Sequence, residues 1–202
     1  MYTPYIRITT GNVQTVLDNV AKNPIGCIYS PPVNMGAPLT TKGLGAQPVF
    51  KYVYYNSTSN PMPVAAPAPV YYTDETFTTV SGNAAEAYSA GTGITGVAIA
   101  GYWMPNTTSI TGLSNVTSAT TQQVNQSYGF IQIAGFLAGA WAPTTATGPG
   151  IGSFITGLAA GSWASVVNTT IIAGRQLGIQ FSAIASSVCD VLVAGYTPFW
   201  GS

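Results

Sequence analysis

The sequence predicts a mainly β fold, with a C-terminal β-barrel or β-sandwich over residues 70–202 and an extended, proline-rich N-terminal arm over residues 1–69 that carries one short helix. Ten of the fourteen prolines lie within residues 1–69, whereas eighteen of the 23 glycines follow residue 81. Eight of the ten charged residues lie within residues 1–86, and the next 88 residues carry no charge. Short apolar runs separated by polar turn clusters fill the second part, as in sandwiches and barrels.

The arm is expected to contain one helix and one strand. Apolar residues recur with the i, i+3, i+4 and i+7 spacing of a helix over about residues 12–22, namely Val13, Val16, Leu17 and Val20. Residues 24–48 contain five prolines and residues 60–69 contain four, so both segments should be extended, the second as a polyproline-II spacer. Residues 49–55 between them, VFKYVYY, are β-branched and aromatic and predict a strand.

Six apolar, β-branched runs predict the strands of the C-terminal domain, at residues 70–79, 95–104, 128–141, 152–167, 169–181 and 188–194. Glycines inside these runs indicate bulges and tight corners. Residues 151–173 are uncharged and long enough to cross a membrane, and residues 157–161 fit a GxxxG motif. Seven Ser, Thr and Asn residues in that window and the lack of a flanking basic bias favour buried strands instead.

The scarcity of charge restricts the function classes. Charged residues make up 5% of the chain and the net charge is zero, whereas an ordinary soluble domain carries about 25% charged residues. A neutral chain has no electrostatic footprint for nucleic acid or for an anionic membrane surface. A surface of Ser, Thr, Asn, Gln, Gly and Tyr without charge is suited to burial against neighbours. The composition therefore indicates a protein that lives in an assembly.

The titratable residues do not form a recognisable catalytic or metal-binding motif. The chain has no histidine, which is the commonest general base and metal ligand, and its acids are scattered at Asp18, Asp74, Glu75, Glu86 and Asp190. Adjacent residues of a strand point to opposite faces, so Asp74 and Glu75 cannot act as a carboxylate pair. Asp190 is expected to form a salt bridge or to accept a backbone hydrogen bond. We therefore expect no enzymatic activity, no metal and no cofactor.

The cysteines and the N-terminus predict a cytoplasmic origin. Cys27 and Cys189 are far apart in sequence and form no CxxC pair, which is typical of small apolar side chains in a reducing compartment. The first ten residues, MYTPYIRITT, lack the basic start, apolar run and small-residue cleavage site of a signal peptide. The chain is therefore expected to be made in the cytoplasm and not secreted.

Aromatic residues are the main candidates for contacts. Tyrosine and tryptophan anchor protein interfaces and fill cores, and their rings also stack on sugars. For the aromatic residues around the predicted strands we favour an interface or core role over sugar binding. The interface candidates are Phe50, Tyr52, Tyr54, Tyr55, Tyr71, Tyr72, Tyr102 and Trp103.

Four segments carry a resemblance to a known family: GVAIA at 96–100, YGFIQIAG at 128–135, GRQLG at 174–178 and VCDVLV at 188–193. In this order and spacing they resemble the small capsid decoration, or cement, proteins of tailed bacteriophage heads. They look like the opening barrel strand, the Y-G-x-V-Q-V-x-G strand, the G-x-x-L-G turn and the final strand of that family. The resemblance covers about residues 94–195, roughly half of the chain.

The resemblance implies a non-enzymatic virion structural protein on the capsid surface, made in the host cytoplasm. Such proteins bind the outside of the shell as homo-oligomers, often trimers, and cover seams between copies of the major capsid protein. The implied partners are the major capsid protein and further copies of the chain, with no nucleic acid and no membrane. Residues 1–69 depart from the compact members of the family, so a tail, neck or fibre component stays open. A carbohydrate-binding module that adsorbs the virion to host glycans is the other alternative.

The predicted strand at 49–55 suggests a role for the arm. Ten prolines divide the apolar residues of the arm into pieces too short to form their own core. In a free tail, the aromatic run would be an exposed edge that invites aggregation. We therefore expect this segment to pair with the barrel or with a neighbouring subunit, and residues 1–69 to mediate attachment to the shell or between subunits.

Overall fold

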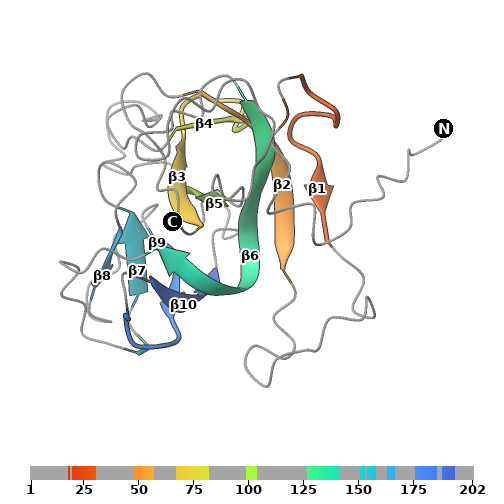
Figure 1. Cartoon of the computed structure of the whole chain (residues 1–202). Helices are drawn as coiled ribbons and strands as arrows, with labels where there is room; N and C mark the ends of the chain where they lie inside the picture. The colour runs from red at the N-terminus through yellow and green to blue at the C-terminus, as the bar shows by residue number, and fades with distance from the viewer. Residues whose placement is uncertain are drawn as a thin grey trace, which may run out of the picture.

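A computed structural model of the chain describes eleven stretches, and its regular elements are all strands (Figure 1). The described residues are 18, 20–30, 48–56, 67–81, 99–103, 127–141, 151–152, 154–157, 163–166, 176–185 and 188–193. Ten strands follow in chain order: β1 (Ile28–Tyr29), β2 (Val49–Tyr55), β3 (Ala68–Tyr72), β4 (Thr79–Ser81), β5 (Ile99–Trp103), β6 (Ser127–Trp141), β7 (Phe154–Gly157), β8 (Trp163–Val166), β9 (Gln176–Gln180) and β10 (Val188–Val193). The predicted mainly β fold is confirmed.

Five strands close into a barrel in the order β2-β4-β3-β5-β6, because β6 pairs with β5 on one side and with β2 on the other. The β2–β4 pair is parallel, and the other pairs in the ring are antiparallel. Figure 1 shows β6 beside β2, with β3, β4 and β5 completing the ring. Closure removes the free edges that an open sheet would expose.

The strand β6 is 15 residues long and belongs to two sheets. Its first part pairs with β2 up to Ala134, and from Gly135 onward it pairs with β10. The sheet then continues through β9 and β7 to β8 (Figure 1). Gly135 lies at the point of change with a φ of 90°, a backbone conformation that glycine adopts without the steric cost of a Cβ. This glycine allows the strand to leave the barrel wall and join the second sheet.

The barrel interior is filled by apolar side chains from all five ring strands. We call this cluster the barrel core; it consists of Val53, Tyr55, Val70, Val80, Ala100, Trp103, Ile131 and Ile133. Gly101 allows β5 to lie close to β6 in the barrel wall. A Cβ at this position would collide with the backbone oxygen of Gln132. Glycine is therefore required there by the approach of two backbones.

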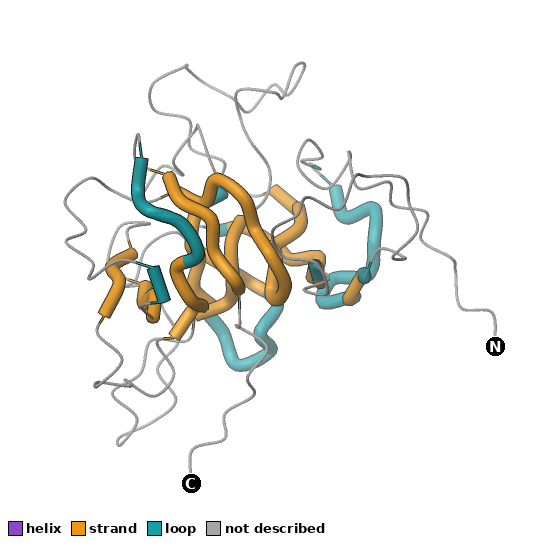
Figure 2. Tube along the Cα trace, turned by 90° about the horizontal axis from the view of Figure 1, so that it is seen from below, coloured by secondary structure: helices purple, strands orange, loops and turns teal. Residues whose placement is uncertain are grey.

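A second cluster joins the outside of the barrel to the second sheet. We call it the outer core; it consists of Phe50, Tyr52, Tyr102, Phe130, Leu137, Ala140, Cys189, Val191 and Val193. Successive residues of a strand point to opposite faces, so β2 contributes Val53 and Tyr55 to the barrel core and Phe50 and Tyr52 to the outer core. Because both faces of β2 are buried, its sequence is apolar and aromatic almost throughout. Seen from below in Figure 2, most strands gather in the centre with described loops around them.

Several strand predictions match the structure closely. The run at 49–55 is β2 with the predicted bounds, and the run at 128–141 is β6 with one further residue. The run at 152–167 is divided into β7 and β8, which pair with each other antiparallel. Of the two pairings considered for residues 49–55, the one within the chain is observed, since β2 is a wall of the barrel.

The arm differs from the sequence expectation in its described parts. Residues 18 and 20–22 of the predicted helix are not helical, because the backbone of Asp18 pairs with Tyr128 of β6 in an antiparallel bridge. Residues 12–17 and 19 lie outside the described residues, as do residues 31–47 and 57–66. The strand β3 crosses the expected boundary between residues 69 and 70, so the barrel takes strands from both sides of it.

Candidate functional site

Most of the predicted interface residues lie in the two cores of the chain itself. Six of the eight have at most 5% of their surface exposed: Phe50, Tyr52, Tyr55, Tyr71, Tyr102 and Trp103. Tyr54 and Tyr72 are partly exposed. A core role therefore accounts for six of these side chains within one chain, and Tyr54 and Tyr72 are the members with surface to offer a partner.

Aromatic rings form a continuous group on the outside of the barrel over β2 and β6. The rings of Tyr52 and Phe130 have centroids 5.0 Å apart, and the rings of Tyr54 and Tyr128 have centroids 4.9 Å apart. The Tyr52 and Tyr128 rings are stacked at 6.3 Å. Tyr54 and Tyr128 are partly exposed, so this group reaches the surface at one end. Such tilted and stacked rings stabilise a sheet beyond their buried area.

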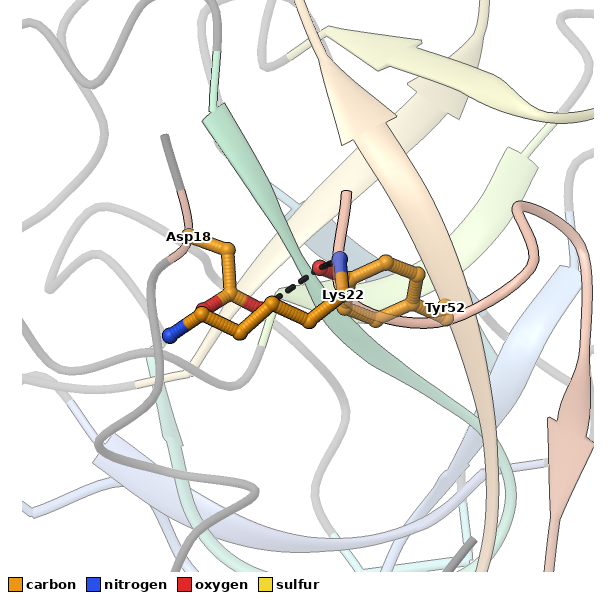
Figure 3. Close-up of polar contacts among 3 residues, drawn as sticks. All are labelled: Asp18, Lys22 and Tyr52. Atoms are coloured by element: carbon orange, nitrogen blue, oxygen red, sulfur yellow. Dashed lines mark hydrogen bonds and ion pairs between the residues drawn. The ribbon is translucent and has the colours of Figure 1, made fainter. Parts of the chain in front are cut away.

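A buried acid holds the described start of the chain against this aromatic group (Figure 3). Asp18 is 2% exposed, and its Oδ2 accepts a 2.6 Å hydrogen bond from the hydroxyl of Tyr52. Its Oδ1 lies 2.9 Å from Nζ of Lys22, whose side chain is 73% exposed. The backbone of Asp18 exchanges two hydrogen bonds of 2.9 and 2.8 Å with Tyr128. We call Asp18, Lys22 and Tyr52 the clamp.

The electrostatics of the clamp suit anchoring rather than catalysis. Burial and then the hydrogen bond to Asp18 raise the pKa of Tyr52 far above its usual range, so the phenol stays protonated and donates to the carboxylate. Tyr52 has no exposed surface and Asp18 almost none, so a substrate cannot reach either reactive oxygen. Only the ammonium of Lys22 faces solvent. The clamp therefore ties Asp18 and Lys22 to β2.

A second polar group lies where the loop between β3 and β4 meets the barrel. Nζ of Lys51 donates to the backbone oxygen of Phe77 at 2.6 Å and to the hydroxyl of Tyr72 at 3.2 Å. The same ammonium lies 4.8 Å from the centre of the Tyr72 ring, a cation–π distance. Phe77 has a φ of 54°, which is unusual for a residue with a side chain, and its ring packs edge-on against Tyr72 at 5.2 Å. Lys51 thus supports a strained loop residue.

Lys51 of β2 and Asp74 of the loop bring two opposite charges together here. Burial lowers the pKa of Lys51, and the charge of Asp74 partly opposes that effect. Burial alone would raise the pKa of Asp74, but hydrogen bonds from Thr79, Thr76 and Thr78 outweigh it and hold the pKa below its ordinary value. Asp74 therefore stays ionised and organises the loop.

The cysteines and remaining acids show no arrangement for metal or redox chemistry in the described part of the chain. Cys27 and Cys189 are both free thiols, and burial raises the pKa of Cys189 to about 12. A thiol that stays protonated is a poor nucleophile and a poor metal ligand. No group of three or more Cys, Asp or Glu side chains comes together among the described residues. Oδ1 of Asp190 accepts a 3.3 Å hydrogen bond from the backbone of Gly139, which is one of its two predicted roles.

Sequence reasoning missed the roles of Asp18, Lys22 and Lys51. Asp18 and Lys22 have the i, i+4 spacing of a helical ion pair and lie in the segment that was predicted to be a helix from its apolar residues. In the structure the same two side chains meet around the hydroxyl of Tyr52 instead. A charged residue inside an otherwise apolar strand such as β2 was the available signal for Lys51, because such a residue needs a local partner.

The four segments that resemble decoration proteins lie next to one another. Residues 99–100 belong to β5, residues 128–135 to β6, residues 176–178 to β9 and residues 188–193 to β10. The sheet order contains these strands consecutively as β5-β6-β10-β9. The described parts of segments that are far apart in sequence thus form one continuous part of the sheet, which spans the barrel wall and the second sheet.

Comparison with known proteins gives no relative: no family model, no curated protein and no solved structure matches the chain. Over the described residues, no helix is long and apolar enough to cross a membrane.

Proposed function

We propose that this chain is a non-enzymatic structural protein of a bacteriophage virion, which binds the outside of the head shell as a decoration protein. In this role it forms a homo-oligomer on the capsid surface and contacts the major capsid protein. Its contribution is to hold neighbouring shell subunits together through many weak polar and aromatic contacts, which shell symmetry repeats around the particle.

The observation that carries the proposal is the joint placement of the four resembling segments. The four runs are neighbours in the sheet and are not scattered among its ten strands. They form the consecutive strands β5-β6-β10-β9. A shared structural unit is what a common fold would require of these segments.

The chemistry of the described residues is compatible with this role. In the clamp, Asp18 and Tyr52 are bonded to each other, and Lys51 is bonded to Tyr72 and Phe77. Both groups stabilise the fold. Among the residues that the structure describes, the exposed large apolar ones lie near the start of the described chain and at the second sheet, namely Val20, Ile25, Ile28, Ile151 and Phe181. Apolar residues at the surface of a nearly uncharged chain favour contacts with neighbouring proteins.

Carbohydrate binding is the second candidate, because Tyr54 and Tyr128 are adjacent, partly exposed rings. Two such rings offer apolar faces to a sugar. A glycan array separates the candidates: a decoration protein should give no specific signal. A signal that Tyr54→Ala removes, without a change in the circular dichroism spectrum, would favour the carbohydrate-binding alternative.

A shell-binding experiment tests the main proposal. The full chain is mixed with undecorated shells assembled from the major capsid protein of the same phage, and the shells are sedimented. We expect saturable co-sedimentation at a fixed number of copies per shell, together with a higher disruption temperature of the decorated shells. Shells that sediment without the chain at saturating concentrations would contradict the proposal. Tail and baseplate assemblies, tested in parallel, identify a tail component if they alone retain the chain.

A further inference from the structure

The layer between the barrel and the second sheet contains a buried hydroxyl that donates to no protein group. Tyr102 of β5 belongs to the outer core and has 0% of its surface exposed. Among the residues that the structure describes, its hydroxyl has no hydrogen-bond partner. Burial raises the pKa of Tyr102 well above its ordinary value, so the phenol keeps its proton and remains a donor. A tyrosine hydroxyl normally finds a partner when it is buried, because leaving it unbonded destabilises the fold.

The same layer contains an unused acceptor, the side-chain oxygen of Gln180. This residue of β9 is 2% exposed, and its Nε2 donates to the backbone oxygen of Ser182 at 2.9 Å. Its Oε1 has no partner in the described part of the chain. Gln180 is directly opposite Val191 of β10, so both side chains lie on one face of the second sheet. Val191 belongs to the outer core together with Tyr102, and β9 also contacts β5.

This combination of an unused donor and an unused acceptor occurs in one place among the described residues. The indole N–H of Trp103 also has no partner, but Trp103 lies on the opposite face of β5, in the barrel core. Oδ1 of Asp18 accepts no hydrogen bond, but it is ion-paired with Lys22 at 2.9 Å. The outer core is therefore the layer in which two complementary buried groups both need a partner.

We propose that the outer core contains an internal water site, in which one water molecule accepts a hydrogen bond from the hydroxyl of Tyr102 and donates one to Oε1 of Gln180. Water is the ligand that fits, because it donates and accepts at once and buried waters bond to polar groups that the protein leaves unsatisfied. The bound water links β5 of the barrel to β9 of the second sheet, two strands that are not paired with each other. This site does not depend on the proposed role at the shell.

A high-resolution crystal structure of the full chain tests the site directly. We expect density for one water molecule within hydrogen-bond distance, about 2.7–3.2 Å, of both Oη of Tyr102 and Oε1 of Gln180. A structure without a water molecule between these two atoms would overturn the inference. So would a protein group bonded to the Tyr102 hydroxyl in its place.

The variant Tyr102→Phe tests the same site in solution, because it removes only the hydroxyl. If a water molecule is bound there, the equilibrium constant for unfolding should rise about fivefold, the effect of one lost hydrogen bond. If the hydroxyl is dry and unbonded, its removal takes away a buried polar group that nothing satisfies, and the constant should stay the same or fall. Urea unfolding measures the constant, and circular dichroism shows that the variant is folded.

The double variant Tyr102→Phe/Gln180→Met tests whether both groups share one water molecule. Gln180→Met alone also removes the bond to Ser182, so it should raise the unfolding constant in either case. With a shared water molecule, the double variant should raise the constant by clearly less than the product of the two single effects. Tyr54→Phe combined with Gln180→Met is the matched control and should give the full product, because Tyr54 is a partly exposed tyrosine on β2. The full product in the Tyr102 pair would overturn the shared site.

Discussion

At the scale of single residues, the polar groups of this protein act as internal anchors. Asp18, Lys51 and Asp74 each engage backbone or hydroxyl groups of neighbouring elements, and each is bonded in the described structure. Three of the ten charged residues of the chain are thus used for internal bonding that holds the fold together.

Two tyrosines lie on the outer side of β2. The hydroxyl of Tyr52 should contribute more to the unfolding free energy than the hydroxyl of Tyr54. In Tyr52→Phe, the buried Oδ2 of Asp18 loses its 2.6 Å donor, and a lost hydrogen bond to a charged group costs about 2 kcal/mol of unfolding free energy. Tyr54→Phe is the matched control: Tyr54 is partly exposed on the same strand, and its change should stay within about 0.5 kcal/mol. Urea unfolding measures both. Equal effects would show that the clamp contributes nothing to stability.

The two thiols should react slowly in the folded protein. Burial raises the pKa of Cys189 to about 12 and also raises the pKa of Cys27, so the thiolate fraction of both is small at neutral pH. We expect a thiol reagent at pH 8 to label Cys27 slowly, and Cys189 more slowly still. Both should react at the rate of a free thiol once the protein is unfolded in urea. Rapid labelling of Cys189 under native conditions would show that the outer core opens.

At the scale of elements, β2 is the strand that joins the arm to the barrel. A chain that begins at Val70 lacks β2, so β4 and β6 would each lose a neighbour and the ring would be open. We expect this variant to lose cooperative thermal unfolding. A chain that begins at Asp18 retains every described element and should unfold as the full chain does. A cooperative transition in the chain that begins at Val70 would place the barrel entirely after residue 69.

The elements themselves could largely be predicted from the sequence, whereas their partners could not. The run VFKYVYY predicts a strand because β-branched and aromatic residues fit a pleated surface, and that strand is β2. A period of two says nothing about which strand lies alongside, so the parallel β2–β4 pair has no signature in the sequence. The helical spacing of Val13 to Val20 includes Asp18, whose bridge to Tyr128 depends on a contact more than 100 positions away. Tertiary contacts of this kind override local periodicity.

From the sequence, the candidate site could be predicted only as a set of aromatic residues, without their arrangement in space. The sequence identified the aromatic residues of β2, β3 and β5 as important, but the division between buried and exposed members depends on the register of β2 against β6.

At the scale of the whole molecule, stability should depend on pH mainly above pH 9. The chain has no histidine, so the unfolding free energy should be nearly constant between about pH 5 and 8. Burial raises the pKa values of Tyr52, Tyr72, Tyr102, Cys27 and Cys189 above their ordinary values of 10.0 and 9.0. Their stabilising effect is complete below pH 9 and is lost as the pH rises towards the folded-state values. The lowered pKa of Lys51 acts in the opposite direction, but it is a single group and is outweighed by the five groups whose pKa values are raised.

Urea unfolding at half-unit steps from pH 5 to 11 measures this profile. The variant Tyr52→Phe removes one of the raised groups and should make the loss of stability above pH 9 less steep. A profile with a clear slope between pH 5 and 8 would mean that a group other than these titrates on unfolding.

Electron cryomicroscopy of shells incubated with the full chain tests the central claim most directly. The account predicts density of the size of this barrel on the outer surface, at positions that follow the shell symmetry. A shell surface identical to that of untreated particles, at concentrations that saturate any binding, would contradict the assignment as a decoration protein.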